Sequence, residues 1–266
     1  MQRFFSYRHQ SISYRIEGEG KPVILLHGFG EDSHIWDQQI AYLKAHCQLI
    51  VPDLPGSGSS QMLTAASSAI SIEDYADCIH ALLEHEKITS CIMLGHSMGG
   101  YIMLAFAEKH PALLTGIGMV HSTAFADSAE KKQNRTRGIE LMETYGGQQF
   151  LKTTIPNLFG PVFKQTHPEQ IENLIVSAAG FSTQTLQQYY AAMRDRPDRT
   201  YVLKSNLLPV LFVIGTADVA APMNDVLKQT HLPLKSYIHI LEGVGHMSMW
   251  EAPILLNQHL LSFIKS

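Results

Sequence analysis

Apolar and polar positions change their period along the chain, and these changes predict a series of strands and helices. Residues 2–7 and 11–17 alternate apolar and polar side chains, which predicts the two strands of a hairpin. The segment PVILLHG at 22–28 is almost continuously apolar, as expected of a strand that is covered on both faces. Residues 34–46 then show helical spacing, with Ser33 as the expected N-cap.

The same unit, an apolar run followed by helical spacing, recurs to the end of the chain. Continuous apolar runs predict further strands at 47–53, 90–96, 113–121, 208–215 and 236–243. Helical spacing predicts helices at 71–87, which opens with a Ser71–Asp74 capping box, and at 97–110, 222–231 and 249–265. Strands that alternate with helices predict an α/β fold with a mostly parallel eight-stranded sheet and helices on both faces.

Residues 122–204 interrupt this rhythm. They are more charged than the rest, contain no clear buried strand, and show helical patterns at 130–147, 168–181 and 183–196. We therefore expect a core domain formed by residues 1–121 and 205–266, with residues 122–204 inserted as a helical cap over the carboxyl edge of the sheet. Several apolar side chains of this segment are expected either to line an enclosed pocket or to form the cap's own core: Phe150, Phe159, Phe163, Tyr189 and Met193.

Composition changes this picture little. The chain has 266 residues, of which 45% are hydrophobic and 17% are charged, so an ordinary globular protein is expected. The net charge of −4 comes from well-mixed charges, and no basic patch indicates a nucleic-acid or membrane partner. Cys47, Cys78 and Cys91 lie in apolar segments without CxxC pairing, and the amino terminus lacks the apolar core of a signal peptide. A cytoplasmic protein with reduced cysteines is expected.

One short segment, LGHSMGG at 94–100, combines a strand end, two glycines and a serine. Ser97 stands where an apolar run turns into a helical pattern with almost no linker. So sharp a turn leaves no room for side chains two residues away on either side, which accounts for Gly95 and Gly99. The helix that follows presents free N–H groups to developing negative charge. The pattern predicts a nucleophilic serine.

A serine nucleophile needs a base and an acid that orients the base. Asp218 follows the strand at 208–215, and His246 follows the last strand, so both leave the sheet at the same carboxyl edge as Ser97. Negative charge that develops on the substrate needs hydrogen-bond donors. The backbone N–H groups of Met98 and of Phe29, in the HGFG loop, are expected to form this oxyanion hole.

These segments resemble the α/β-hydrolase family in order along nearly the whole chain. HGFGEDSHIW resembles its oxyanion loop, PDLPGSGSS the loop after its fourth strand, GHSMGG its nucleophile elbow, GTADVAAP its acid loop, and GVGHMSMWEAP its histidine loop. The resemblance implies Ser97, Asp218 and His246 as the catalytic triad, with His27 and Gly28 as supporting residues of the oxyanion loop. The cap pattern is similar to that of small bacterial carboxylesterases and 3-oxoadipate enol-lactonase-like members.

The resemblance implies a serine hydrolase of the carboxylesterase class that acts on small or medium esters or lactones without a cofactor. Epoxide hydrolases and haloalkane dehalogenases are excluded, because they carry a carboxylate where this chain has Ser97. C–C hydrolases, thioesterases, lyase-like members, methyl esterases and haloperoxidases keep a serine and remain alternatives, as does a ligand-sensing signalling protein. The oligomeric state is left open.

Two other patterns carry less weight. His80 and His85 lie five positions apart and do not share a helix face as the histidines of a zinc-binding H-E-x-x-H helix do, so no metal site is expected. Four methionines lie near the expected site in the sequence and either line an adaptable apolar pocket or belong to the core. They are Met98, Met223, Met247 and Met249.

Overall fold

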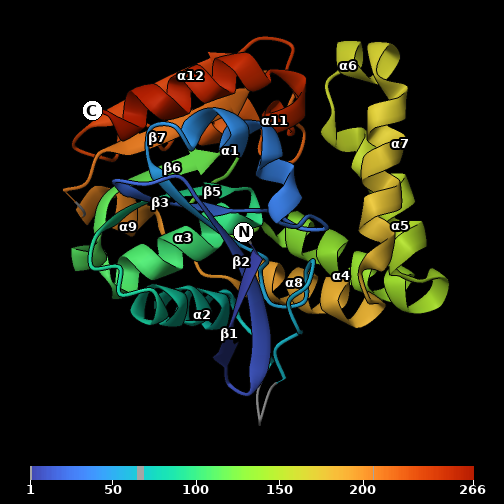
Figure 1. Cartoon of the computed structure of the whole chain (residues 1–266). Helices are drawn as coiled ribbons and strands as arrows, with labels where there is room; N and C mark the ends of the chain where they lie inside the picture. Colours follow the sequence, from blue (N-terminus) through green and yellow to red (C-terminus); the bar gives the residue numbers. More distant parts are fainter. Residues whose placement is uncertain (1, 65–68, 206) are drawn as a thin grey trace.

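The computed structural model describes residues 2–64, 69–205 and 207–266, and an eight-stranded sheet runs through its centre (Figure 1). The strand order across the sheet is β1-β2-β4-β3-β5-β6-β7-β8. Strand β2 runs antiparallel to both of its neighbours, and all pairs from β4 to β8 are parallel, which confirms the mostly parallel sheet. The strands are β1 (Gln2–Tyr7), β2 (Gln10–Glu17), β3 (Pro22–Leu26), β4 (Gln48–Pro52), β5 (Cys91–His96), β6 (Leu114–Val120), β7 (Val210–Gly215) and β8 (Ser236–Leu241).

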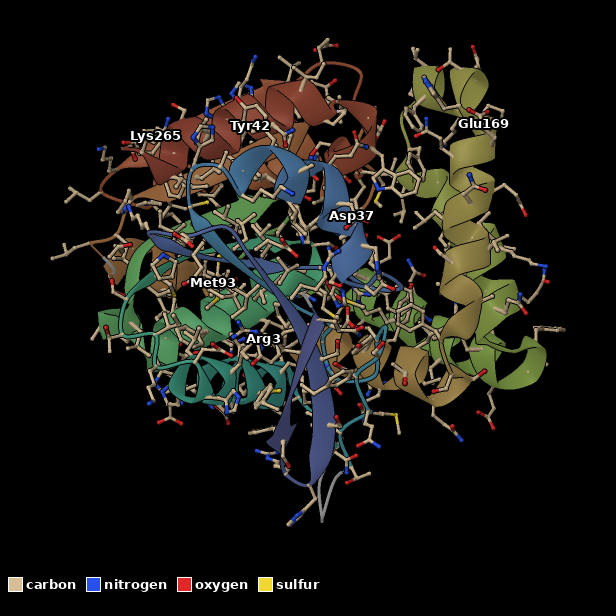
Figure 2. The ribbon with its side chains drawn as sticks, viewed as in Figure 1. Arg3, Asp37, Tyr42, Met93, Glu169 and Lys265 are labelled. Atoms are coloured by element: carbon tan, nitrogen blue, oxygen red, sulfur yellow. The ribbon has the colours of Figure 1, made fainter. Side chains whose placement is uncertain are left out.

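The continuous apolar runs of β3, β5 and β7 are buried on both faces of the sheet, whereas β8, at the edge of the sheet, is partly exposed. Val23 and Leu25 of β3 pack on the side of α1 and α12, whereas Ile24 and Leu26 pack on the side of α2 and α3. In Figure 2 the side chain of Met93, on β5, lies within this core. A strand that is covered on both faces has no polar side to alternate with, which is why these segments are apolar throughout.

Helices cover both faces, with α1 and α12 on one and α2 and α3 on the other (Figure 1). The capping box is present at the start of α2, as predicted. The helices of the sheet-forming segments are α1 (Asp37–Leu43), α2 (Ile72–His85), α3 (Met98–Lys109), α10 (Met223–Leu227), α11 (Ser248–Glu251) and α12 (Pro253–Ile264), with short 3₁₀ turns η1 (Ser33–Trp36) and η2 (Pro111–Leu113).

Three predicted helices differ in their ends. The helix predicted at 34–46 opens with η1, whose N-cap is Asp32 rather than Ser33, because the Asp32 carboxylate accepts a hydrogen bond from the His34 N–H. The helix predicted at 222–231 ends at Leu227. The helix predicted at 249–265 is broken after Glu251, because Pro253 cannot continue the preceding hydrogen-bond ladder and instead starts α12.

Between β6 and β7 the chain is helical and, among the described residues, contains no strand. Helices α4 and α8 pack against each other, and α5, α6 and α7 stand beside the sheet at the right of Figure 1. The elements are α4 (Ala129–Tyr145), α5 (Gly147–Thr154), η3 (Ile155–Leu158), α6 (Pro161–Thr166), α7 (Pro168–Ser177), η4 (Ala178–Gly180), α8 (Thr183–Asp195) and α9 (Thr200–Ser205).

The three cysteines are free thiols buried in the core, as expected of packing residues. Burial raises the pKa of the Cys78 and Cys91 thiols to about 12, so neither ionises near neutral pH. Among the described residues, no helix is both long enough and apolar enough to span a lipid bilayer.

Candidate active site

Ser97 occupies a sharp turn between β5 and α3. Its φ of 50° and ψ of −114° are unusual for a residue with a side chain, and the chain passes from strand to helix at this single residue. A Cβ added at Gly95 would lie 2.4 Å from the backbone of Gly99, and one added at Gly99 would lie 2.5 Å from the carbonyl oxygen of Leu26. The two glycines are therefore required by close backbone contacts, as the pattern predicted.

Asp218 and His246 meet at the same edge of the sheet. Nδ1 of His246 lies 2.8 Å from Oδ2 of Asp218, and both residues are buried. The other carboxylate oxygen of Asp218 accepts hydrogen bonds from the N–H groups of Ala220 and Ala221 at 2.8 and 2.9 Å. These bonds hold the carboxylate in one orientation, so that it orients the His246 ring.

A third side chain, His121, which no sequence motif marks as a site residue, also contacts this carboxylate. Its Nδ1 lies 3.1 Å from Oδ2 of Asp218, and the residue follows β6 with a φ of 50°. Burial lowers the pKa of His121 to about 4, although Asp218 opposes the change. His121 is therefore neutral at pH 7 and donates its Nδ1–H to Asp218.

Asp218 and His246 have opposite pKa shifts. Burial alone raises the pKa of Asp218, but the charge of His246 and the hydrogen bonds from both histidines hold it well below its usual range. Burial lowers the pKa of His246, but the charge and the hydrogen bond of Asp218 outweigh burial, and the net result is a pKa above 6.5. Asp218 is thus ionised throughout the physiological range, and Asp218 holds the pKa of His246 above its ordinary value.

The loop after β3 and the start of α3 supply N–H groups next to Ser97. Among the described residues, no hydrogen-bond acceptor is recorded for the N–H of Phe29, and Met98 opens α3, where the first N–H groups lack partners within the helix. His27 holds this loop: its Nε2 accepts a hydrogen bond from the Leu54 N–H at 2.9 Å, and its Nδ1 lies 2.8 Å from the carbonyl oxygen of Gly28.

A cavity lies between Ser97, His246 and the segment between β6 and β7. Ser97, His246 and Phe29 line it together with residues of that segment. The complete lining is Phe29, Glu31, Ser97, Tyr101, Arg135, Leu158, Tyr190, Met193, Ala220 and His246.

The predicted pocket residues divide between this cavity and the core. Met193 lines the cavity, and Phe150 lines the space that adjoins it. Phe159, Phe163 and Tyr189 are buried in the core clusters, so for these three the packing alternative holds rather than the pocket-lining one. The four methionines near the site likewise belong to the core, with Met223 at its edge.

Comparison with known proteins identifies the fold. A sequence model of the alpha/beta hydrolase fold family matches residues 21–128. The structure of a thermophilic esterase from Thermogutta terrifontis superposes with a TM-score of 0.92 at 27% identity, covering 100% of this chain and 98% of the esterase. The chain has the α/β-hydrolase fold.

Two curated relatives show how the family varies. The (E)-2-((N-methylformamido)methylene)succinate hydrolase of Acinetobacter baylyi is 24% identical over 263 residues, which cover 97% of this chain and 95% of the relative. The dihydrolipoyllysine-residue acetyltransferase component of the acetoin cleaving system of Pseudomonas putida is 26% identical over 255 residues. That match covers 95% of this chain but only 66% of the relative. The chain therefore resembles bacterial hydrolases, including an esterase, as the sequence predicted.

A buried ion pair connects the loop after β3 to the loop after β8, which carries His246. Oε2 of Glu31 accepts hydrogen bonds from the Gly28 N–H at 2.7 Å and from Nδ1 of His96 at 3.0 Å. Nε2 of His96 lies 2.9 Å from the carbonyl oxygen of His246. Burial alone raises the pKa of Glu31, but His96 and the Gly28 N–H lower it, so Glu31 is ionised. Because both partners of His96 can only accept, His96 carries a proton on each nitrogen.

Glu31→Gln is expected to destabilise the hydrolase. The substitution leaves the protonated His96 ring, which is 0% exposed, without its counter-charge. Removing one partner of a buried ion pair costs about 3–5 kcal/mol. The free energy of unfolding in urea measures this loss. Glu172→Gln, at an exposed position of α7, is the matched control and should change it by less than about 0.5 kcal/mol. A loss below about 1 kcal/mol for Glu31→Gln would contradict the ion pair.

The segment between β6 and β7 is hydrogen-bonded directly to the histidine loop. The His246 N–H donates to the carbonyl oxygen of Leu158 at 2.6 Å. The carboxylate of Glu251 accepts from the N–H groups of Gly245 and Met247 on the histidine loop and from that of Gly160. These bonds fix one edge of the segment between β6 and β7 against the loop that carries His246.

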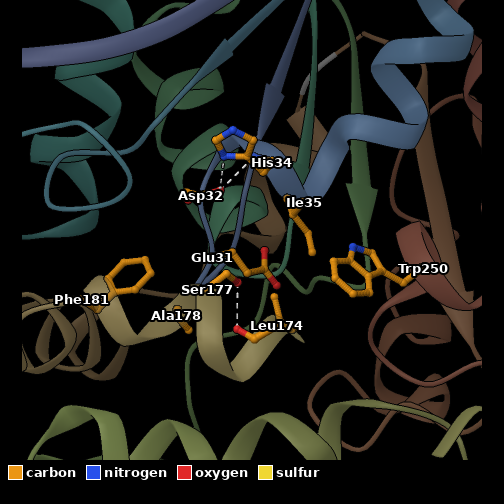
Figure 3. Close-up of a pocket in the computed structure, with 10 residues that line it drawn as sticks. Glu31, Asp32, His34, Ile35, Leu174, Ser177, Ala178, Phe181 and Trp250 are labelled. Carbon is orange, nitrogen blue, oxygen red and sulfur yellow. Dashed lines mark hydrogen bonds and ion pairs between the residues drawn. The ribbon is translucent and has the colours of Figure 1, made fainter. Parts of the chain in front are cut away.

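A second cavity lies on the other side of Glu31, between the loop after β3 and the end of α7 (Figure 3). Glu31 lines both cavities, and Trp250, Leu174 and Phe181 give the second one a largely apolar wall. Within the described chain, His121, Asp218 and His246 offer atoms close enough together to hold a metal ion, but these atoms are hydrogen-bonded to one another. His80 and His85 do not converge, because His80 stacks on His110 and His85 on Phe5.

Proposed function

We propose that this α/β hydrolase is a serine hydrolase that cleaves carboxylic esters or lactones of small or medium size through an acyl-enzyme on Ser97. One observation carries the proposal. The residue in the strained turn, Ser97, lines the same cavity as His246, whose Nδ1 lies 2.8 Å from the ionised Asp218. A nucleophile, a base and an acid that orients the base are the groups that acyl transfer requires.

Each residue takes one part in the proposed reaction. Nε2 of His246 accepts the hydroxyl proton as Oγ of Ser97 attacks the carbonyl carbon, and the carbonyl π electrons move onto its oxygen. The N–H groups of Phe29 and Met98 bind that oxyanion. As the intermediate collapses, His246 passes its proton to the departing alkoxide, and the acyl group stays on Ser97. A water molecule repeats the sequence and releases the acid.

We also propose that residues 122–204 form a cap domain over this site, on a core made of residues 1–121 and 205–266. Leu158, Tyr190 and Met193 belong to the inserted segment and line the cavity of Ser97. Phe29 of the core packs against Tyr190 in a tilted arrangement with ring centroids 4.6 Å apart, and it meets Phe150 edge to face at 6.4 Å. These contacts are evidence for a cap that closes over the substrate cavity, with core residues on one side of the substrate and cap residues on the other.

An enclosed site is expected to favour short acyl groups. We expect kcat/KM for 4-nitrophenyl esters to be highest for short acyl chains and to fall steeply toward palmitoyl, because the whole acyl group must fit beneath the roof before attack. A chain-length series measures this. The hydrogen bonds from His246 to Leu158 and from Gly160 to Glu251 hold the roof in place, so no jump in rate is expected at a lipid surface.

Two results would contradict this proposal. A rise in kcat/KM toward long chains, or activation by a lipid emulsion, would show that the cap moves as a lid. Release of only one product molecule per chain would favour a ligand-sensing protein over an enzyme.

A further inference from the structure

The cavity of Ser97 has a basic wall on its cap side. Arg135, on α4, lines this cavity and also the adjoining one, which it shares with Tyr101, Tyr190 and Ala220. Lys131, one helical turn before Arg135, lines the adjoining cavity as well. The two spaces thus meet around one guanidinium group.

The charges on this wall do not cancel. Asp127 is the carboxylate that pairs with Arg135, through Nε, and the same carboxylate also pairs with Nη2 of Arg196 at 2.9 Å. The side chains of Asp127 and Arg196 are only 2% and 3% exposed. One carboxylate between two guanidinium groups leaves a net charge of +1 in a poorly solvated place, where an unbalanced charge is costly.

Arg196 makes several hydrogen bonds through its guanidinium group, whereas Arg135 has N–H donors that are still available. Arg196 donates to the carbonyl oxygens of Met193 and Phe125 at 2.6 and 3.0 Å, and it lies 3.8 Å above the Tyr101 ring. Arg135 uses only Nε toward Asp127, and within the described part of the chain its two terminal nitrogens have no hydrogen-bond partner. Its side chain is 18% exposed, so these nitrogens keep access to the cavity that it lines.

The other carboxylate that lines the cavity of Ser97, that of Glu31, does not neutralise this net positive charge. Glu31 is engaged by His96 and by the Gly28 N–H, as described above. The guanidinium of Arg135 lies 5.0 Å from the centroid of the Tyr190 ring, and this contact holds it at the cavity wall. A positioned guanidinium with two free terminal nitrogens matches a carboxylate, which it binds through two parallel hydrogen bonds.

We propose that Arg135 binds a carboxylate carried by the substrate, so that the preferred substrates are esters or lactones with an anionic group in addition to the reacting carbonyl. The proposal rests on the proposed hydrolase function and specifies its substrate class. The carboxylate lies either on the acyl part or on the leaving group, and both arrangements use the same Arg135 contact.

Paired substrates test this contact. For the acyl side, kcat/KM is measured for 4-nitrophenyl hydrogen glutarate and for its methyl ester, with spontaneous hydrolysis subtracted. For the leaving-group side, 4-acetoxybenzoate is compared with methyl 4-acetoxybenzoate. In at least one pair the wild-type enzyme should prefer the acid on the order of 10- to 100-fold, since hydrogen bonds to charged groups have this strength.

Variants on one helix then assign the preference. Arg135→Gln should remove most of the preference for the acid over the ester. Arg135→Lys keeps the positive charge but lacks the planar guanidinium that binds a carboxylate through two hydrogen bonds, so it should retain part of this preference. Arg137→Gln is the matched control, because Arg137 is exposed on the same helix two residues away, and it should leave the ratio unchanged.

Three outcomes overturn the proposal. A wild-type enzyme that hydrolyses both neutral esters as fast as the acids shows no carboxylate site, while leaving the hydrolase function intact. If Arg135→Gln and Arg135→Lys both keep the full acid-over-ester preference of the wild type, Arg135 is not the carboxylate site, and the hydrolase function again stays intact. If no ester is hydrolysed at all, the hydrolase function is wrong, and calorimetry with glutarate decides the site. Binding to the wild type that is at least tenfold tighter than to Arg135→Gln supports it, and equal or absent binding overturns it.

Discussion

Replacing Ser97 with alanine is expected to lower kcat for an activated short-chain ester on the order of 10⁶-fold, the loss that follows removal of a triad nucleophile. The change removes Oγ, so no acyl-enzyme can form. The variant still binds the ester and still has hydrogen-bond donors around its carbonyl. These alone accelerate hydrolysis roughly 10³–10⁴-fold over the uncatalysed reaction in water. Initial rates with a 4-nitrophenyl ester of a short acid measure the loss.

The control for Ser97→Ala separates chemistry from folding. Ser59→Ala, at an exposed serine of the loop after β4, should keep wild-type turnover. Alanine at position 97 has to adopt the same φ of 50° as Ser97. The rates are therefore compared only if both variants have the ellipticity and the unfolding midpoint of the wild type. A phosphonate that labels the wild type at Ser97, located by mass spectrometry of peptides, should not label Ser97→Ala. Activity within tenfold of wild type would place the nucleophile at another residue.

The sheet could be predicted from the sequence because its signal is local. Each central strand is an apolar run buried on both faces, and each run ends in a glycine or a polar residue at the same edge. Ser97 could be assigned to the turn because Gly95 and Gly99 mark close backbone contacts that no larger residue tolerates. The catalytic roles of Ser97, Asp218 and His246 remain predictions, although the structure places all three at this edge.

The polar support of the site could not be predicted in this way. Glu31 and His96 are 65 residues apart, and His96 and His246 are 150 apart, so their contacts depend on the assembled sheet. His121 is one of fourteen histidines, and its only local signal is that it ends an apolar run at the carboxyl edge. A search for every polar residue that ends a predicted strand could have found it.

The inserted segment was predicted less completely for a different reason. Its long helices α4, α7 and α8 show helical spacing in the sequence, but α5, α6 and α9 are eight residues or shorter. Helices of that length are stabilised by tertiary packing rather than by their own sequence. The same holds for the pocket lining, because neighbouring residues of α8 diverge: Tyr189 packs in the core and Tyr190 faces the cavity.

Replacing Asp218 with asparagine is expected to reduce kcat/KM about 10⁴-fold, as the loss of a triad acid with retained geometry does. Oδ1 of Asp218 accepts two backbone N–H groups, from Ala220 and Ala221. The amide oxygen of asparagine must take that place, which turns its NH₂ group toward His246 and His121. Nδ1 of His246 then becomes an acceptor, its proton moves to Nε2, and the ring cannot accept the proton of Ser97.

Asp195→Asn provides the control for this exchange. Asp195 is exposed at the end of α8 and pairs with the neighbouring Arg194, so its amide should leave kcat/KM within twofold of wild type. Asp218→Glu tests the geometry separately, because it keeps the charge and moves the carboxylate by one methylene group. A loss of less than tenfold in Asp218→Asn would mean that another residue orients His246.

The pH dependence gives the Asp218→Asn prediction a second readout. His246 acts as a base only when it is neutral, so wild-type kcat/KM should be lost as the pH falls, with a midpoint above 6.5 because Asp218 raises the pKa of His246 against the effect of burial. In Asp218→Asn the raising charge is gone while burial remains, so the midpoint should move to lower pH. The ratio of wild-type to variant activity should therefore be smaller at pH 5 than at pH 8. An unchanged midpoint, measured over pH 5 to 9 with a substrate for which chemistry limits the rate, would show that Asp218 does not stabilise the charged form of His246.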